Sequence, residues 1–167
     1  MYLNENQLIL WIEEAGQVES AVNNVLREYA PEYHDEVLKK IAFTAMEQHL
    51  FKGSRRAVSH ISEPVRQEVL LQMINKHKKG FGFKNRNFFF TAWLETIKLL
   101  SVENQKDEII YFIVYIVQTY IPSDHLISLV GKALILVGST IMKPISCGIK
   151  EWENTVEGLR FESFRVF

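Results

Sequence analysis

Histidine and cysteine often catalyse reactions or hold metals, and the sequence contains six such side chains. They are His34, His49, His60, His77, His125 and Cys147. No histidine stands in an H-E-x-x-H or Glu-x-x-His arrangement, the helical spacings that bring ligands for zinc or a di-metal centre onto one face. The one cysteine can form neither a disulfide within the chain nor a cysteine cluster for zinc. The sequence therefore predicts no metal site and no cofactor.

Sequence patterns for a nucleophile or for a phosphate-binding loop are also missing. No serine lies in G-x-S-x-G, and Gly131-Lys132 is followed by alanine where a phosphate-binding loop has serine or threonine. Cys147 could act as a nucleophile only with a histidine beside it in the folded chain, which the sequence does not establish. We therefore predict that the protein is not an enzyme and acts by binding.

A basic segment with two phenylalanines is one candidate binding site. Between residues 76 and 86 lie Lys76, Lys78, Lys79, Phe81, Phe83, Lys84 and Arg86. The five cations suit contacts with phosphates, and the two rings suit stacking on bases. The segment is a hypothetical site for single-stranded nucleic acid, and the competing interpretation is a solvated loop between helices.

Residues 79–83 resemble the start of the eight-residue signature of the RNA-recognition-motif family. The shared pattern is a basic residue, glycine, an aromatic residue, a small residue and a second aromatic residue. Lys84 then replaces an aliphatic residue of the signature, and Arg86 replaces an aromatic one. The signature implies aromatics on a central strand that stack on bases. Because the segment is flanked by predicted helices, the resemblance does not extend to the four-stranded sheet of that family.

Acidic residues are concentrated near the start of the chain. Residues 1–51 carry a net charge of −6, residues 52–86 carry +7, and the remainder brings the total to −1. The acids that we expect at the ends and outer faces of the first three helices are Glu13, Glu14, Glu19, Glu28, Glu32, Asp35 and Glu36. Such a surface suits a basic partner, because opposite charges steer association. The alternative is an ordinary solvated surface.

In general character the chain is similar to bacterial immunity or antitoxin proteins, although no motif carries the similarity. That similarity implies an inhibitor that neutralises a toxin or a nuclease by covering its phosphate-binding site. We therefore predict a non-catalytic protein that binds another protein through its acidic surface. Binding of nucleic acid through residues 76–86 is the alternative, and a membrane-associated helical hairpin is the third hypothesis.

Helices must position these side chains, because apolar residues recur at three- and four-residue intervals along most of the chain. We predict seven helices, over residues 4–15, 18–29, 31–50, 62–79, 87–100, 103–121 and 126–142. Asn4 and Gln7 are placed like a capping pair. Leu8, Trp11, Ile12 and Ala15 would form the inner stripe of the first helix. Gly53 would end the third helix, and residues 54–61 would form a basic linker.

The last two predicted helices form a hairpin that is almost entirely apolar between residues 109 and 142. Residues 109–121 are apolar on every face, which is typical of a helix enclosed on all sides. A buried strand is the competing interpretation, but the segment is longer than a usual strand. Insertion into a membrane is disfavoured, because thirteen residues of helix span about 20 Å of a hydrocarbon core of about 30 Å.

Together these patterns predict an all-α fold: a single-domain irregular helical bundle over residues 1–167 with a central apolar hairpin. Residues 159–167 suggest a short strand or an ordered tail. The single cysteine favours a reducing compartment, and the acidic N-terminus does not resemble a secretory signal. We therefore expect a cytoplasmic location.

Overall fold

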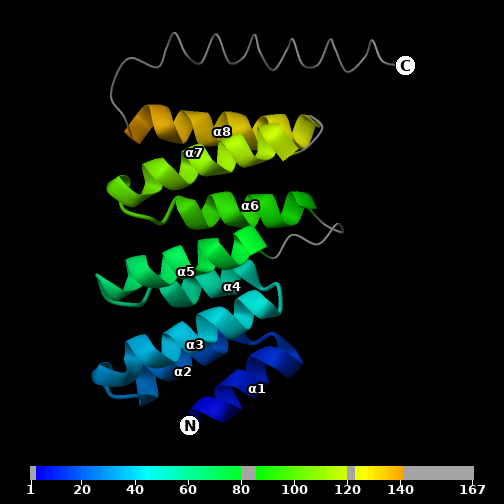
Figure 1. The fold of residues 1–167 in the computed structure, drawn as a ribbon. Coiled ribbons are helices and arrows are strands. Elements are labelled where there is room, and N and C mark those ends of the chain that lie inside the picture. The colour runs from blue at the N-terminus through cyan, green and yellow to red at the C-terminus, as the bar shows by residue number, and fades with distance from the viewer. Residues whose placement is uncertain (1–2, 80–85, 120–122, 141–167) are drawn as a thin grey trace, which may run out of the picture. The chain divides into compact units, whose positions relative to one another are not determined.

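Helices make up most of the computed structural model, which describes residues 3–79, 86–119 and 123–140 of the chain (Figure 1). No strand occurs among these residues, so the all-α prediction is confirmed. The chain divides into unit 1, Met1–Phe81, and unit 2, Gly82–Phe167. The assignment of residues 1–167 to one domain stays a prediction.

The described part of unit 1 is a stack of helices around α3 (Figure 1). Its elements are α1 (Glu5–Ala15), α2 (Val18–Glu28), the 3-10 turn η1 (Pro31–Tyr33), α3 (His34–Glu47), α4 (Phe51–Val58) and α5 (Val65–Lys79). α3 contacts α1, α2, α4 and α5. Its buried stripe consists of Val37, Leu38, Ile41, Ala42, Ala45 and Met46, which recur at three- and four-residue intervals. α3 is therefore the centre of unit 1.

The ends of α1 are fixed by local hydrogen bonds that the sequence predicts. The side chain of Asn4 accepts a bond of 3.0 Å from the backbone N–H of Gln7, and the Gln7 side chain accepts one of 2.9 Å from the Asn4 N–H. At the other end Gly16 adopts a left-handed conformation with φ of 64° and donates its N–H to the Ile12 carbonyl. Both predicted boundaries are confirmed.

The linker predicted for residues 54–61 is wrong, because α4 occupies most of that segment. Gly53 lies inside α4 and does not cap α3. The buried residues of α4 are Phe51, Ser54, Ala57 and Val58, which recur at helical spacing. The prediction was wrong because basic residues lie between these buried positions, so the composition of the segment resembles that of a linker.

Two close contacts hold α4 in place. The hydroxyl of Ser54 is buried and donates a hydrogen bond of 2.6 Å to the Ala42 carbonyl of α3. Gly53 faces α2 so closely that a Cβ atom at this position would lie 2.8 Å from the Cβ of Val18. Real Cβ atoms avoid such a separation, so only glycine fits without a shift of the two helices.

Unit 2 contains three helices in its described residues, α6 (Arg86–Ile97), α7 (Val102–Thr119) and α8 (Asp124–Thr140), and each contacts the other two. Its core includes the fully buried rings of Phe90, Trp93 and Phe112. The centroids of the Trp93 and Phe112 rings lie 4.9 Å apart in an edge-to-face arrangement, a favourable geometry for aromatic pairs. Phe90 and Trp93 both belong to α6, so their burial identifies the inward face of that helix.

The predicted hairpin forms from α7 and α8, but it is not enclosed on all sides. Ile110, Tyr111, Val114 and Val117 of α7 are exposed, and Ile135 of α8 is 70% exposed. Among the described helices, none combines the length and the apolar character that crossing a membrane requires. The predicted C-terminal strand or tail and Cys147 lie outside the described residues.

Candidate functional site

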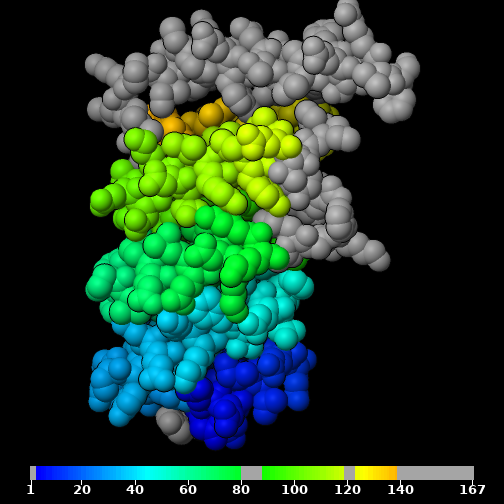
Figure 2. Space-filling view, in the orientation of Figure 1, coloured from blue at the N-terminus to red at the C-terminus, as the bar shows by residue number. Residues whose placement is uncertain are grey.

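The outer face of α1 exposes two large apolar side chains. Leu10 is 49% exposed and Trp11 is 41% exposed, whereas Leu8 and Ile12 turn inward. Trp11 and Ala15 were predicted to lie on the inner stripe, but both are exposed, so these two predictions are wrong. Five consecutive apolar residues, 8–12, hide the helical period at this point. Dark blue atoms of α1 form part of the visible surface of unit 1 in Figure 2.

Two carboxylates lie next to these apolar side chains. Glu13 and Glu14 follow Leu10 by three and four residues, and Glu14 follows Trp11 by three, so all four side chains are neighbours on the helix surface. Both glutamates are exposed. Within the described residues, neither makes an ion pair or a hydrogen bond through its carboxylate. Leu10, Trp11, Glu13 and Glu14 are called the α1 face from here on.

The position of the two glutamates is unfavourable for the helix itself. They lie in the last turn of α1, where the helix dipole is negative and where no basic residue is present. An acid near a helix C-terminus costs about 0.3–1 kcal/mol at an exposed position. Helix stability therefore does not account for the presence of Glu13 and Glu14.

Glu19 extends the acidic surface towards α2, because only Gly16 and Gln17 separate the two helices. Its side chain is exposed, and it lies in the first turn of α2. There a carboxylate stabilises the helix through the dipole. Glu19 thus has a structural explanation that Glu13 and Glu14 lack.

The other four predicted acids begin at the opposite end of α2, where Glu28 lies about 14 Å from Glu19 along the helix axis. Glu28 ends α2 and Glu32 belongs to η1, and both are exposed. Asp35 and Glu36 begin α3. The structure therefore divides the seven predicted acids into two groups.

The carboxylates of Asp35 and Glu36 have identified partners within unit 1. Asp35 accepts a hydrogen bond of 2.9 Å from the backbone N–H of Ser62 and a second from its hydroxyl, which fixes the segment before α5. Glu36 forms an ion pair of 3.0 Å with Lys40. Hydrogen bonds from Lys40 to Glu5 and Glu36 raise the pKa of this lysine above its ordinary value. Asp35 and Glu36 therefore have structural roles.

The predicted basic segment is described only in part. Lys76, Lys78 and Lys79 form the last turn of α5, where cations suit the helix dipole. Arg86 is the first residue of α6. Phe81, Phe83 and Lys84 lie outside the described residues, so their predicted arrangement stays a prediction.

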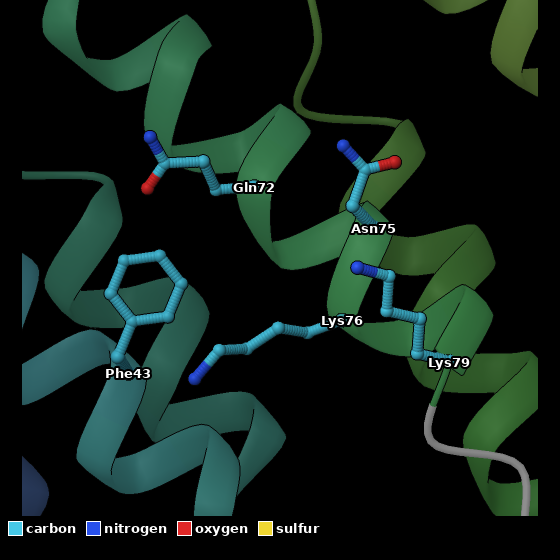
Figure 3. Close-up of a pocket in the computed structure, with 5 residues that line it drawn as sticks. All are labelled: Phe43, Gln72, Asn75, Lys76 and Lys79. Atoms are coloured by element: carbon cyan, nitrogen blue, oxygen red, sulfur yellow. The ribbon is translucent and has the colours of Figure 1, made fainter.

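A pocket of about 440 Å³ opens on the surface of unit 1 between α3 and α5 (Figure 3). It is lined by Phe43, Gln72, Asn75, Lys76 and Lys79. Two of these residues were predicted to bind nucleic acid, and three were missed. Nothing in the sequence around Phe43 indicates a binding site. Its position in the pocket depends on the packing of α3 against α5.

Lys76 crosses this pocket towards α3. Its ammonium nitrogen lies 2.6 Å from a carboxylate oxygen of Glu47 and 4.8 Å from the centroid of the Phe43 ring. In Figure 3 its side chain points at the ring. The charge of Lys76 is therefore shared between an exposed ion pair and a cation–π contact.

His77 lies between two lysines in the sequence but is buried in unit 1. Its ring centroid is 5.2 Å from that of Phe51. Burial, assisted by the positive charge of Arg55, lowers the pKa of His77 to about 4. The described residues contain no group of three or more His, Cys, Asp or Glu side chains that could hold a metal ion.

No protein-family model, no curated protein and no solved structure matches this chain significantly. The functions proposed for the chain therefore rest on its own residues.

Proposed function

We propose that the protein is a non-catalytic binding protein whose α1 face contacts a basic protein. The concrete form of the proposal is an inhibitor of the immunity or antitoxin type, which neutralises a toxin or a nuclease. The observation that carries it is the exposure of Trp11 and Leu10 beside Glu13 and Glu14. Energetically dominant residues at interfaces are often tryptophans that enter a pocket of the partner.

The charges of the α1 face favour a basic partner over an acidic one. Glu13, Glu14 and the neighbouring Glu19 are exposed, and three like charges would repel an acidic surface. A partner with a basic patch beside an apolar pocket would complement both the carboxylates and the apolar side chains of the α1 face. The phosphate-binding site of a nuclease is one surface of that kind.

Replacement of Trp11 by alanine tests the apolar part of the proposed interface. Partners are first captured with the tagged protein from its own cells, with and without nuclease treatment, and the affinity of a purified nuclease-resistant partner is then measured. We expect Trp11→Ala to weaken binding by about 30-fold, because truncation of a dominant interface residue costs at least about 2 kcal/mol. Tyr33→Ala, which removes another exposed ring of unit 1, is the matched control and should leave the affinity unchanged.

Replacement of Glu13 and Glu14 by lysine tests the acidic part with two opposite readouts. We expect slower association with the partner, because the steering charge is reversed. The thermal midpoint should rise, because cations suit the C-terminus of α1. A fall in both the association rate and the thermal midpoint would mean that the glutamates stabilise the fold.

Unchanged affinity in this variant and in Trp11→Ala would remove the α1 face as the binding site. Partners lost on nuclease treatment would favour nucleic-acid binding.

A further inference from the structure

The pocket between α3 and α5 combines three kinds of chemistry on two helices. Gln72, Asn75, Lys76 and Lys79 follow one another at intervals of three, one and three residues, which places them on one face of α5. Phe43 of α3 faces them across the pocket (Figure 3). The described residues of the lining therefore supply one aromatic ring, two carboxamides and two ammonium groups.

Asn75, Lys79 and Gln72 supply free hydrogen-bonding capacity in this pocket. Within the described residues, neither the Asn75 nor the Lys79 side chain takes part in a hydrogen bond or an ion pair. In Figure 3 the Lys79 ammonium turns towards Asn75. The side-chain N–H of Gln72 donates a hydrogen bond of 2.8 Å to the carboxylate of Glu68, which leaves the Gln72 side-chain carbonyl free to accept one. The pocket thus offers a cation, an amide and an acceptor.

Lys76 supplies a second cation that can change partners. Its ammonium lies over the Phe43 ring and against Glu47. An aromatic ligand that stacks on Phe43 must displace this ammonium. A phosphate attached to the same ligand would give the displaced charge a new partner, because charge-assisted contacts to phosphate are strong. Stacking and anion binding would therefore occur together.

We propose that this pocket binds a nucleotide unit, a planar base joined to a phosphate. The base lies against Phe43, Asn75 and Gln72 hydrogen-bond its edge, and Lys79 and Lys76 hold the phosphate. The volume of about 440 Å³ is sufficient for one such unit. The unit belongs either to a free nucleotide or to a single strand. The inference does not depend on the α1 face, which lies on another helix.

Binding is measured with the full chain and two kinds of probe. The first probe is a fluorescein-labelled short oligouridylate or oligoadenylate, followed by anisotropy at low salt. The second is the free mononucleotide, UMP or AMP, followed by calorimetry. Either probe bound by the wild type supports the proposal if the variants respond as expected. Binding of the mononucleotide identifies a free nucleotide as the source of the ligand, and binding of the strand alone identifies single-stranded nucleic acid.

Three variants at two lysines locate the phosphate contact. We expect Lys79→Glu to weaken binding about tenfold or more. Lys52→Glu, an equal charge change at an exposed position of α4 outside the pocket, should weaken it less than about threefold. For an oligonucleotide probe, Lys79→Gln should also lower the slope of log affinity against log salt by about 0.7. Equal losses in Lys79→Glu and Lys52→Glu would overturn the site, because they would indicate attraction to net charge alone.

Phe43→Leu separates stacking from charge. Leucine keeps an apolar side chain against α5 but removes the flat ring, and we expect affinity to fall about fivefold. Far-UV circular dichroism and the thermal midpoint check that this variant is folded. Unchanged affinity in folded Phe43→Leu would overturn the stacking contact and with it the proposed ligand. The absence of binding of both probes to the wild type at low salt would overturn the proposal as well.

Discussion

At the scale of single residues, burial lowers the pKa of the His77 side chain. The sequence surrounds it with lysines, but the structure places its ring inside unit 1, against Phe51. Its pKa falls to about 4 because the buried environment and Arg55 disfavour the charged form. His77 is therefore a neutral part of the core at neutral pH.

The lowered pKa of His77 predicts a loss of stability in mild acid. Below pH 6.5 the histidine of the unfolded chain takes up a proton, whereas the folded chain resists protonation down to about pH 4. Unfolding therefore becomes more favourable by about 1.4 kcal/mol per pH unit across that window, with no contribution above it. Urea unfolding of the wild type and His77→Gln at several pH values measures the difference in slope. Parallel pH profiles would show that His77 is protonated equally in both states.

Some side-chain contacts could be predicted from the sequence, and others could not. Asn4 and Gln7 were predictable, because their hydrogen bonds join residues three apart. Trp11 was assigned to the wrong face, because residues 8–12 are all apolar and the choice is made by packing against α2 and α3. Phe43 became a candidate only once α5 was placed beside it. Local contacts can thus be read from sequence, whereas contacts between helices cannot.

At the scale of elements, α4 is the helix that was not predicted from the sequence. It is short, with eight residues, and contains Gly53 and three basic residues, all of which suggest a loop. Its buried positions become recognisable only with the knowledge that α2 and α3 lie against it. In the described part of the chain, the other seven α-helices extend over enough turns for their apolar spacing to be recognised.

The close approach of α4 to α2 predicts that Gly53→Ala destabilises the protein. The added methyl group would meet the side chain of Val18 at 2.8–2.9 Å. Overpacking typically costs about 1–3 kcal/mol, and the better helix propensity of alanine returns up to about 1 kcal/mol. We expect a net loss of roughly 1–2 kcal/mol, measured by urea unfolding.

Gly131→Ala is the matched control for this substitution. Gly131 lies within α8, and a Cβ atom there would meet nothing within 4 Å. The same change should therefore stabilise the protein by about 0.5–1 kcal/mol through helix propensity. Equal effects of the two substitutions would mean that the contact with Val18 relaxes without cost.

At the scale of the whole molecule, folding places side chains of the acidic and the basic regions of the sequence side by side. Glu47 of the acidic region pairs with Lys76 of the basic region at 2.6 Å. In the reverse arrangement, Lys39 of the acidic region lies 3.9 Å from Glu68 of the basic region. Both pairs occur within unit 1, so the values of −6 and +7 along the sequence do not describe two separate surfaces. The carboxylates of the α1 face lie outside both pairs.

The predicted single domain has a direct test in Gly53→Ala. The chain contains two units, but its sequence has no low-complexity linker between them, and its length suits one domain. If residues 1–167 unfold as one domain, a substitution in unit 1 lowers the free energy of global unfolding for both units. The most protected amides of each helix exchange through that unfolding and should therefore all be affected equally. We therefore expect the most protected amides of α3 and of α7 to exchange faster by the same factor, roughly 5–30-fold, in hydrogen-exchange mass spectrometry. Faster exchange in α3 with unchanged protection in α7 would instead establish two domains, because the free energy lost in α4 would then be confined to the helices that share its core.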